Sequence, residues 1–292
     1  MLQFSINLLS NVQVNGFEWE LKRNHLKIDS QSKRPFYYVF TTLLLPLNTF
    51  KNLNALVFAA GLGTRLRPLT DNRPKALVEV NGRPLLEHNL LKLKAAGFTR
   101  VVVNVHHFGE QIIDFLSANG NFGLDIRVSD ERALLLDTGG GLRKAMPLFS
   151  SDEPVLIHNV DIVSDADLAA IYRRHISSGA DATLAINQRT TSRYLMFDDA
   201  LRLRGWTNVQ TGEVKGERAP LLRAFSGIHV VSSALAAHLN AFRADDVPFP
   251  IMDFYLGRCS ELDFRGVELP DGCRWVDCGK VESLAKAAEI LA

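Results

Sequence analysis

The chain has 292 residues, of which 47% are hydrophobic and 22% are charged, and its formal net charge is +1. This composition is typical of a globular protein with one large or two modest domains. A net charge so close to zero offers no extended basic surface for nucleic acid or for an anionic membrane, and we expect neither as a partner.

Three cysteines, Cys259, Cys273 and Cys278, lie near the C-terminus. A zinc site built on Cys273 and Cys278 lacks its other ligands, since structural zinc takes four. Reduced thiols fit the pattern better, because disulfides are rare in reducing compartments. We therefore expect a cytoplasmic protein.

Residues 1–53 differ in pattern from the rest of the chain. Their apolar run at residues 36–47 is shorter than the roughly 20 apolar residues that a transmembrane helix needs. It also lies too far from the N-terminus, behind charged residues, for a signal peptide. We interpret residues 1–53 as an extension, either disordered or produced by a wrongly assigned start codon, ahead of one domain at residues 54–292. The alternative is a genuine extension that packs on the domain or on a partner.

The domain opens with a continuous apolar run at residues 55–60, which predicts a strand of a parallel sheet that is covered on both faces. Glycines 61 and 63 follow, and they let the backbone turn sharply and bring N–H groups close to a ligand. Arg65 adds a planar cation suited to phosphate, and Lys75 adds a second cation ten residues later. Together, the strand, the glycine turn and the two cations predict that this segment binds a nucleoside triphosphate. The nucleotide contacts that we expect here are Ala60, Gly61, Gly63 and Thr64.

Two better-known glycine motifs do not fit this turn. A P-loop ends in Gly-Lys-Ser or Gly-Lys-Thr, and no such triplet follows at the required spacing. A dinucleotide-binding fingerprint needs a third glycine, and Leu66 occupies that position. A dinucleotide-dependent oxidoreductase is therefore disfavoured.

Helix and strand patterns alternate along the next part of the domain. Expected helices cover residues 85–96, 111–119, 139–146 and 165–177, and expected strands cover residues 101–105, 124–129, 155–158 and 182–187. After about residue 190 the pattern changes to short strands at 194–197, 201–203 and 213–215, then a strand at 225–231 and helices at 233–239 and 281–291. We predict an α/β fold with a mostly parallel, Rossmann-like sheet, helices on both faces and a small antiparallel subregion.

Asp161 follows the apolar strand at residues 155–158, at the end where open α/β sheets bind their ligands. A carboxylate in such a place is costly unless it is paired or holds a cation. We therefore expect Asp161 to bind a metal ion, the alternative being a cap for the following helix.

The complete phrase around the glycine turn is G-x-G-T-R-x-x-P-x-T-x-x-x-P-K-x-L, at residues 61–77. It resembles the signature of sugar-phosphate nucleotidyltransferases, which join a sugar 1-phosphate to a nucleotide and release pyrophosphate. The resemblance extends over residues 54–292 and implies that Arg65 and Lys75 are the catalytic cations, which bind the triphosphate and stabilise the transition state. It also implies a nucleoside triphosphate and a sugar 1-phosphate as the partners.

The same resemblance implies a Mg²⁺ ion held by two aspartates. Residues 275–279 (WVDCG) resemble the family's C-terminal W-x-D-x-G phrase, in which the aspartate, here Asp277, shares the metal with Asp161. Mg²⁺ prefers few protein carboxylates, several waters and substrate phosphates. Before Asp161 this chain has Asn159-Val160 where relatives commonly have Asn-Gly, and Asn159 is expected to contact the nucleotide. The alternative for Asp277 is a simple turn before the last helix.

Residues 137–141 (DTGGG) start a helix with a glycine run, and in the relatives such a turn contacts the nucleobase. Gly139 and Gly140 are therefore expected nucleotide contacts, unless the turn is an ordinary one. Residues 225–228 (FSGI) resemble a strand that lines the sugar pocket, which implies sugar contacts by Ser226 and Gly227. Lys215 is the candidate for the lysine that grips the sugar phosphate in relatives, although its spacing does not match cleanly.

The compact length and these three phrases are most similar to the small bacterial uridylyltransferases that act on N-acetylmuramate 1-phosphate. The similarity implies UTP as the nucleotide and a role in cell-wall sugar recycling. The alternatives are a guanylyl- or thymidylyltransferase for another sugar, such as mannose 1-phosphate, and a non-catalytic regulator that binds nucleotide sugars. The regulator is disfavoured because the expected catalytic and metal-binding residues are all present.

Overall fold

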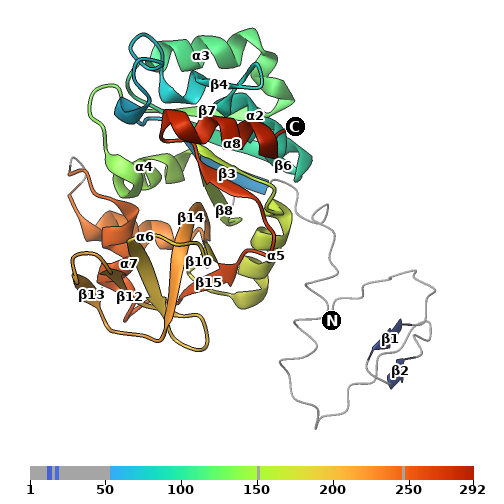
Figure 1. Ribbon diagram of the computed structural model, residues 1–292, viewed down its shortest axis with the longest axis vertical. Coiled ribbons are helices and arrows are strands. Elements are labelled where there is room, and N and C mark those ends of the chain that lie inside the picture. Colours follow the sequence, from blue (N-terminus) through green and yellow to red (C-terminus); the bar gives the residue numbers. More distant parts are fainter. Residues whose placement is uncertain (1–11, 15–16, 20–52, 150–151, 245–246) are drawn as a thin grey trace.

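The computed structural model describes residues 12–14, 17–19, 53–149, 152–244 and 247–292. Within these residues a mixed sheet of ten strands forms the centre, and helices cover both of its faces (Figure 1). The strands β1 (Val12–Val14) and β2 (Phe17–Trp19) pair only with each other, as antiparallel neighbours. Most of the expected extension at residues 1–53 lies outside the described residues, so its interpretation stays a prediction.

Four parallel strands form one part of the large sheet, in the order β8-β3-β6-β7. They are β3 (Leu53–Phe58), β6 (Phe98–Val105), β7 (Asp125–Asp130) and β8 (Val155–Asn159). Every residue of β3 is buried, as expected for a strand between two parallel neighbours. The carboxyl ends of β3 and β8 lie side by side, which brings the glycine turn close to Asp161.

β14 (Leu221–Val231) is antiparallel to β8 and belongs to two parts of the sheet. Its later residues pair with β10 (Ala182–Asn187), which in turn is parallel to β15 (Phe264–Glu268). Its first residues pair with β11 (Arg193–Phe197), and β12 (Leu203–Asn208) and β13 (Val214–Gly216) continue outward as antiparallel strands. The predicted α/β fold is therefore confirmed, and β11, β12 and β13 form the antiparallel subregion.

Each face of the sheet has its own hydrophobic core, because successive residues of a strand point to opposite faces. Ala55 and Val57 belong to a cluster that includes side chains of α2 (Leu85–Ala95), α3 (Gly109–Ala118), α5 (Leu168–Ser178) and α8 (Val281–Ile290). Leu56 and Phe58 belong to a second cluster with α4 (Asp137–Ala145), α6 (Leu235–Phe242) and α7 (Ile251–Arg258).

Several short elements were not predicted from the sequence. β9 (Ile162–Ser164) and β16 (Trp275–Asp277) pair with each other, and a pairing of two three-residue strands so far apart leaves no periodic signal. β12 begins at Leu203 instead of residue 201, because Leu201 sits in the preceding turn with a φ of +57°. The remaining small elements are β4 (Glu79–Val80), β5 (Arg83–Pro84), and the 3-10 helices η2 (Thr64–Leu66), η3 (Lys75–Leu77), η4 (Gly120–Gly123) and η5 (Met146–Leu148).

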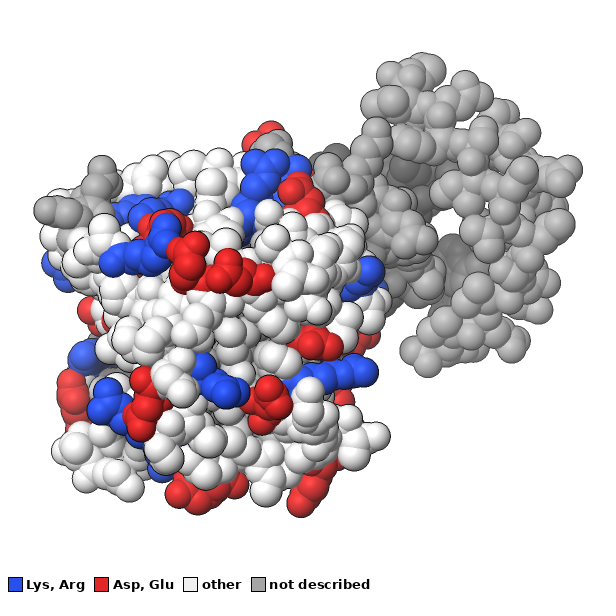
Figure 2. Space-filling model, turned by 90° about the horizontal axis from the view of Figure 1, so that it is seen from above, with Lys and Arg blue, Asp and Glu red and all other residues white. Residues whose placement is uncertain are grey.

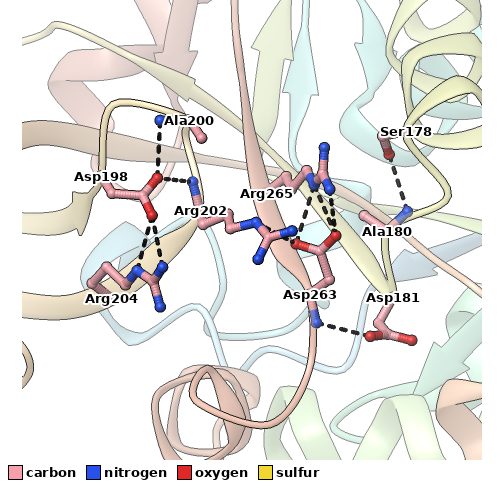
Figure 3. Close-up of polar contacts among 9 residues, drawn as sticks. All are labelled: Ser178, Ala180, Asp181, Asp198, Ala200, Arg202, Arg204, Asp263 and Arg265. Carbon is pink, nitrogen blue, oxygen red and sulfur yellow. Dashed lines mark hydrogen bonds and ion pairs between the residues drawn. The ribbon is translucent and has the colours of Figure 1, made fainter. Parts of the chain in front are cut away.

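Ion pairs connect the antiparallel subregion to the segment that contains β15 (Figure 3). Asp198, in the turn before β12, accepts a hydrogen bond from Arg204 at 2.8 Å. Arg202 lies 3.4 Å from Asp263, which also accepts from Arg265 at 2.7 Å. Each of these arginines has a carboxylate partner, so the cluster stabilises the fold and does not offer an uncompensated cation to a substrate.

On the face shown in Figure 2, the Lys and Arg side chains of the described surface alternate with Asp and Glu and do not gather by sign. Cys259, Cys273 and Cys278 are free thiols. None of the described helices has the length and apolar character needed to span a membrane.

Candidate active site

The turn after β3 is built around Gly63, which has a left-handed φ of +65°. A Cβ at this position would lie 2.9 Å from Thr70 Cγ2 and 3.0 Å from Lys75 Cβ, so glycine is required by both conformation and space. The Thr70 hydroxyl donates to Gly63 O at 2.8 Å. Three residues of the nucleotidyltransferase phrase therefore contact one another, which explains why they occur together.

The outer side of the turn faces solvent. Gly61, Thr64 and Arg65 are exposed, and no described atom lies within 4 Å of a Cβ built on Gly61. The protein itself does not require a glycine there, so the space beside Gly61 is available to a ligand. Leu66, the residue that breaks the dinucleotide fingerprint, is fully buried and anchors the turn.

A buried polar network holds the start of the turn, and it was missed by the sequence reasoning. Asn104, near the end of β6, accepts from Ala59 N at 2.6 Å and from Ala60 N at 3.2 Å, and it donates to Glu131 Oε1 at 2.9 Å. Glu131 is fully buried and also accepts from Leu136 N at 3.0 Å. Burial raises the pKa of Glu131 against the opposing effect of these hydrogen bonds. The N–H of Ala60 is thus occupied by Asn104, and the available sequence signal was an asparagine inside an otherwise apolar strand.

Lys75 reaches from η3 to the end of β8, where its Nζ donates to Asp161 Oδ2 in a short ion pair. The two side chains are only 11% and 16% exposed. An ammonium group has three N–H donors, so this contact leaves others for phosphate oxygens. The ion pair brings together two residues that were predicted separately, one as a catalytic cation and one as a metal ligand.

Asp277 lies beside Asp161 because β16 pairs with β9. Asp277 is opposite Ile162 in this ladder, and Cys278 N donates to Asp161 O at 2.7 Å. Burial and the negative charge of Asp161 raise the pKa of Asp277 above its ordinary value of 3.8. This is the direction expected for two carboxylates that share a site.

The donor chemistry of these two aspartates fits a divalent cation. Among the residues that the structure describes, no group of three or more His, Cys, Asp or Glu side chains could hold a metal ion. A cation at Asp161 and Asp277 would therefore take most of its ligands from water or substrate phosphates, which is the coordination that Mg²⁺ prefers. It would also relieve the repulsion that raises the pKa of Asp277.

Gly279 leaves room for the guanidinium group of Arg65 next to Asp277. A Cβ on Gly279 would lie 2.5 Å from Arg65 Nη2 and 2.7 Å from Asp277 Oδ1. The positive charges of Lys75 and Arg65 oppose the rise in the pKa of Asp277. Two cations and two carboxylates therefore border one small region at the carboxyl ends of β3 and β8.

The glycine run of α4 packs against the segment that precedes α7. Phe249 O accepts from Gly139 N at 2.8 Å and from Gly140 N at 3.3 Å. A Cβ on Gly139 would lie 2.2 Å from Phe249 Cε2, and one on Gly141 would lie 2.8 Å from Glu131 Oε1. The glycines are thus explained by close packing, and the N–H groups of Gly139 and Gly140 point to Phe249. The contact of Gly139 and Gly140 with a nucleobase stays a prediction, and it would have to use atoms other than these N–H groups.

Gly227 lies where β14 passes the end of β8. Its φ is +76°, and a Cβ would lie 2.8 Å from Ile162 Cγ1 and 3.1 Å from Asn159 Nδ2. Gly227 and the half-buried Asn159 therefore border the site. Ser226 does not, because its side chain is fully buried and donates to Ala185 O at 2.8 Å. The Ser226 hydroxyl is therefore not available to the sugar, and the sugar contact of Ser226 stays a prediction for its backbone atoms.

Lys215 lies apart from the four charged residues. It is on β13, the edge strand, which stands three strands away from β14, or about 14 Å at the usual strand spacing (Figure 1). Its side chain is 52% exposed, lies 3.7 Å from Glu213 Oε1 and covers the ring of Trp206 at 5.5 Å. The structure does not bring Lys215 to the site, so its sugar-phosphate role stays an untested prediction.

Comparison with known proteins agrees with this geometry. A nucleotidyl transferase family model matches residues 54–197, which include the glycine turn, Lys75 and Asp161. An N-acetylmuramate alpha-1-phosphate uridylyltransferase of Caulobacter vibrioides is 34% identical over 253 residues, covering 82% of this chain and 96% of the relative. The chain belongs to the sugar-phosphate nucleotidyltransferase family. The resemblance seen in the sequence is thus confirmed, and the chain is an enzyme that transfers nucleotidyl groups to sugar 1-phosphates.

Two further matches extend the family assignment. An N-acetylmuramate alpha-1-phosphate uridylyltransferase of Neisseria meningitidis is 42% identical over 121 residues, which is 41% of this chain and 52% of the relative. The solved structure of a UDP-glucose pyrophosphorylase from Acinetobacter baumanii has a TM-score of 0.65 at 17% identity, and the match covers 81% of this chain and 92% of that one. The second match supports the nucleotidyltransferase fold alone. Asp277 lies outside the residues of the family model and joins this nucleotidyltransferase site through the pairing of β16 with β9.

Proposed function

We propose that this nucleotidyltransferase transfers the uridylyl group of UTP to N-acetylmuramate 1-phosphate, with Mg²⁺ bound by Asp161 and Asp277, in the recycling of cell-wall sugars. The meeting of Arg65, Lys75, Asp161 and Asp277 at the carboxyl ends of β3 and β8 carries the proposal. The activities for which two relatives are named support the choice of sugar and nucleotide. The free thiols of the cysteines fit the expected cytoplasmic location.

The reaction needs positioning and charge stabilisation more than a nucleophilic side chain. An oxygen of the sugar phosphate forms a bond to the α-phosphorus of UTP while the bond from that phosphorus to the bridging oxygen breaks. Pyrophosphate leaves with the electron pair, so negative charge grows on the leaving group. Two anions must also approach each other, which requires cations on both sides of the reacting phosphorus.

The residues of the site divide this work between them. Arg65 is exposed beside the glycine turn, and in this proposal it binds the triphosphate from the solvent side. Lys75 is fixed by Asp161 and donates its remaining N–H groups to phosphate oxygens. Asp161 and Asp277 would hold Mg²⁺, which when bound neutralises phosphate charge and orients the triphosphate. Gly61 lets the phosphates approach the backbone closely.

A substrate panel tests the proposal. Pyrophosphate release is measured with UTP, GTP and dTTP, each combined with the 1-phosphates of N-acetylmuramate, N-acetylglucosamine, glucose and mannose. We expect the highest kcat/KM for UTP with N-acetylmuramate 1-phosphate, and no turnover in the presence of EDTA. Preference for GTP with mannose 1-phosphate would contradict the proposed substrates, and absence of turnover with every pair would favour a non-catalytic binding protein.

A further inference from the structure

Arg189 is a cation near the site that neither the sequence pattern nor the reaction described above uses. It follows β10 by two residues, at the carboxyl end of that strand. Its Nη1 donates to Asn187 Oδ1 at 2.9 Å and its Nη2 donates to Phe225 O at 2.8 Å. Its guanidinium carbon lies 4.1 Å from the centre of the Trp275 ring, so the guanidinium group is held by stacking as well as by hydrogen bonds.

Arg189 differs from other arginines of the described residues in its lack of a close ion pair. Arg189 forms no ion pair within 4.0 Å among the described residues, whereas Arg204, Arg223 and Arg265 each pair with an acid. Its side chain is half-buried, and this burial lowers its pKa. Burying a charge is costly unless an opposite charge compensates it, so the position favours an anionic ligand.

The backbone places Arg189 next to the reacting groups. Trp275 and Asp277 are two positions apart on β16 and therefore lie on the same side of that strand. The negative charge of Asp277 raises the pKa of Arg189, against the effect of burial. Trp275 Nε1 also donates to Ser226 O at 2.9 Å, which fixes the ring beside the segment of β14 that reaches the site at Gly227.

The geometry of the guanidinium group suits an oxyanion. Two of its five N–H donors are used by Asn187 and Phe225, so three remain for a ligand. The planar fork binds phosphate or carboxylate oxygens in pairs, and the stacked ring limits its rotation. Arg65 and Lys75 come from the N-terminal part of the domain, whereas Arg189 is held by residues of β10, β14 and β16.

We propose that Arg189, supported on Trp275, binds an anionic group of the sugar substrate. The inference rests on the proposed function, since it assumes a sugar 1-phosphate as the second substrate. The bound oxyanion is either the phosphate, which all sugar 1-phosphates share, or the carboxylate that N-acetylmuramate carries and N-acetylglucosamine lacks. In both cases the assignment is independent of Lys215, which lies on the edge strand β13.

Steady-state kinetics of Arg189→Ala and Arg189→Lys test the inference, with Arg193→Ala as the control. Arg193 is an exposed arginine four residues further along the same segment. We expect Arg189→Ala to raise the KM for the sugar 1-phosphate by about 10- to 100-fold, the size of one to two lost charge-assisted hydrogen bonds. The KM for UTP should change by less than about threefold. Arg189→Lys keeps the charge without the planar fork, so its KM for the sugar 1-phosphate should lie between those of the wild type and Arg189→Ala.

Two sugars distinguish the sources of the anion. An equal rise in KM for the 1-phosphates of N-acetylmuramate and N-acetylglucosamine assigns the phosphate to Arg189, and a rise confined to N-acetylmuramate assigns the carboxylate. Unchanged KM values for both sugars, or an equal effect of Arg193→Ala, would overturn the inference. A wild-type enzyme inactive with every sugar would instead remove the proposed function. If Arg189→Ala does not fold, Trp275→Phe takes its place in the test. This substitution keeps an aromatic face next to Arg189, and we expect a smaller rise in the KM for the sugar 1-phosphate.

Discussion

The reaction site and the antiparallel subregion use charged side chains in different ways. At the carboxyl ends of β3 and β8, Lys75 pairs with Asp161, and Asp277 beside them keeps a raised pKa. In the subregion of β11, β12 and β13, the charged side chains pair with each other, as Asp198 does with Arg204 (Figure 3). Balanced charges stabilise a fold, whereas a half-buried charge without a full partner is available to a ligand. The raised pKa of Asp277, more than the number of charged residues, therefore marks the site.

The largest effect is expected from removal of the two cations at the site. Arg65→Ala and Lys75→Ala should each lower kcat/KM by more than about 100-fold, because each removes a donor that stabilises charge in the transition state. Pyrophosphate release measures this loss, and thermal unfolding shows whether the variants are folded.

Lys215→Ala provides the matched lysine from the antiparallel subregion. Since Lys215 contacts Glu213 and the ring of Trp206, we expect kcat/KM to stay within about twofold of the wild type. A loss of activity comparable to that of Lys75→Ala would show that the subregion reaches the substrates, and the contrast between the two regions would fail.

The second effect concerns Asp277, where activity and stability should move in opposite directions. The folded-state pKa of Asp277 is raised, so its ionisation destabilises the fold as the pH rises through that raised value. Asp277→Asn should therefore raise the Tm by a few degrees at pH 7 in EDTA, while cutting turnover and increasing the Mg²⁺ concentration required. The stabilisation should vanish below the ordinary carboxyl pKa, near pH 3.5, where the wild-type side chain is also neutral. A lower Tm for the variant at pH 7 would contradict the expected repulsion between Asp161 and Asp277.

The third effect separates backbone strain from crowding at the border of the site. Gly227 and Gly212 both have a φ of +76°, but only Gly227 has neighbours within 4 Å of a Cβ. Alanine at either position should cost about 1–3 kcal/mol through strain, and Gly227→Ala should cost more because it also meets Ile162 and Asn159. Chemical denaturation measures the difference. Only Gly227→Ala should also raise the KM for UTP, and equal behaviour of the two variants would show that the approach of β14 to Asn159 does not matter.

The smallest effect is expected at the N-terminus. β3 begins at Leu53, which is 1% exposed, so a truncated chain that starts at Leu53 keeps the complete central strand. We expect its Tm and turnover to match those of the full chain. A chain that starts at Leu56 loses the first half of β3 and should unfold several degrees lower. A loss of several degrees or of most activity on starting at Leu53 would show that residues 1–52 are part of the working enzyme.

The sequence predicted the parts of the site that depend on neighbouring residues. The phrase at residues 61–77 is a local unit in which Gly63, Thr70 and Lys75 contact one another, so the local sequence alone defines the turn. The strand before Asp161 was equally clear, because a continuous apolar run ends at the carboxyl edge of a parallel sheet. The α/β fold followed from the same alternation of strands and helices.

Other parts depend on contacts between distant segments and could not be predicted in this way. The Asn104–Glu131 hydrogen bond links β6 to the residue after β7 through a single pair of side chains, and the stacking of Arg189 on Trp275 joins residues that share no motif. At Ser226 the phrase indicated the strand that borders the site, but the alternation of side chains along that strand buries the Ser226 hydroxyl in the core. Which face of a strand meets the substrate is set by register, which the pattern of one sequence did not determine.

β14 limits how the two regions can move. It has 11 residues, and it pairs with β11 at its start and with β8 at its end. A hinge between the two regions would have to break ladder hydrogen bonds of this one continuous strand. Closure around the substrates by rotation of one region against the other is therefore disfavoured.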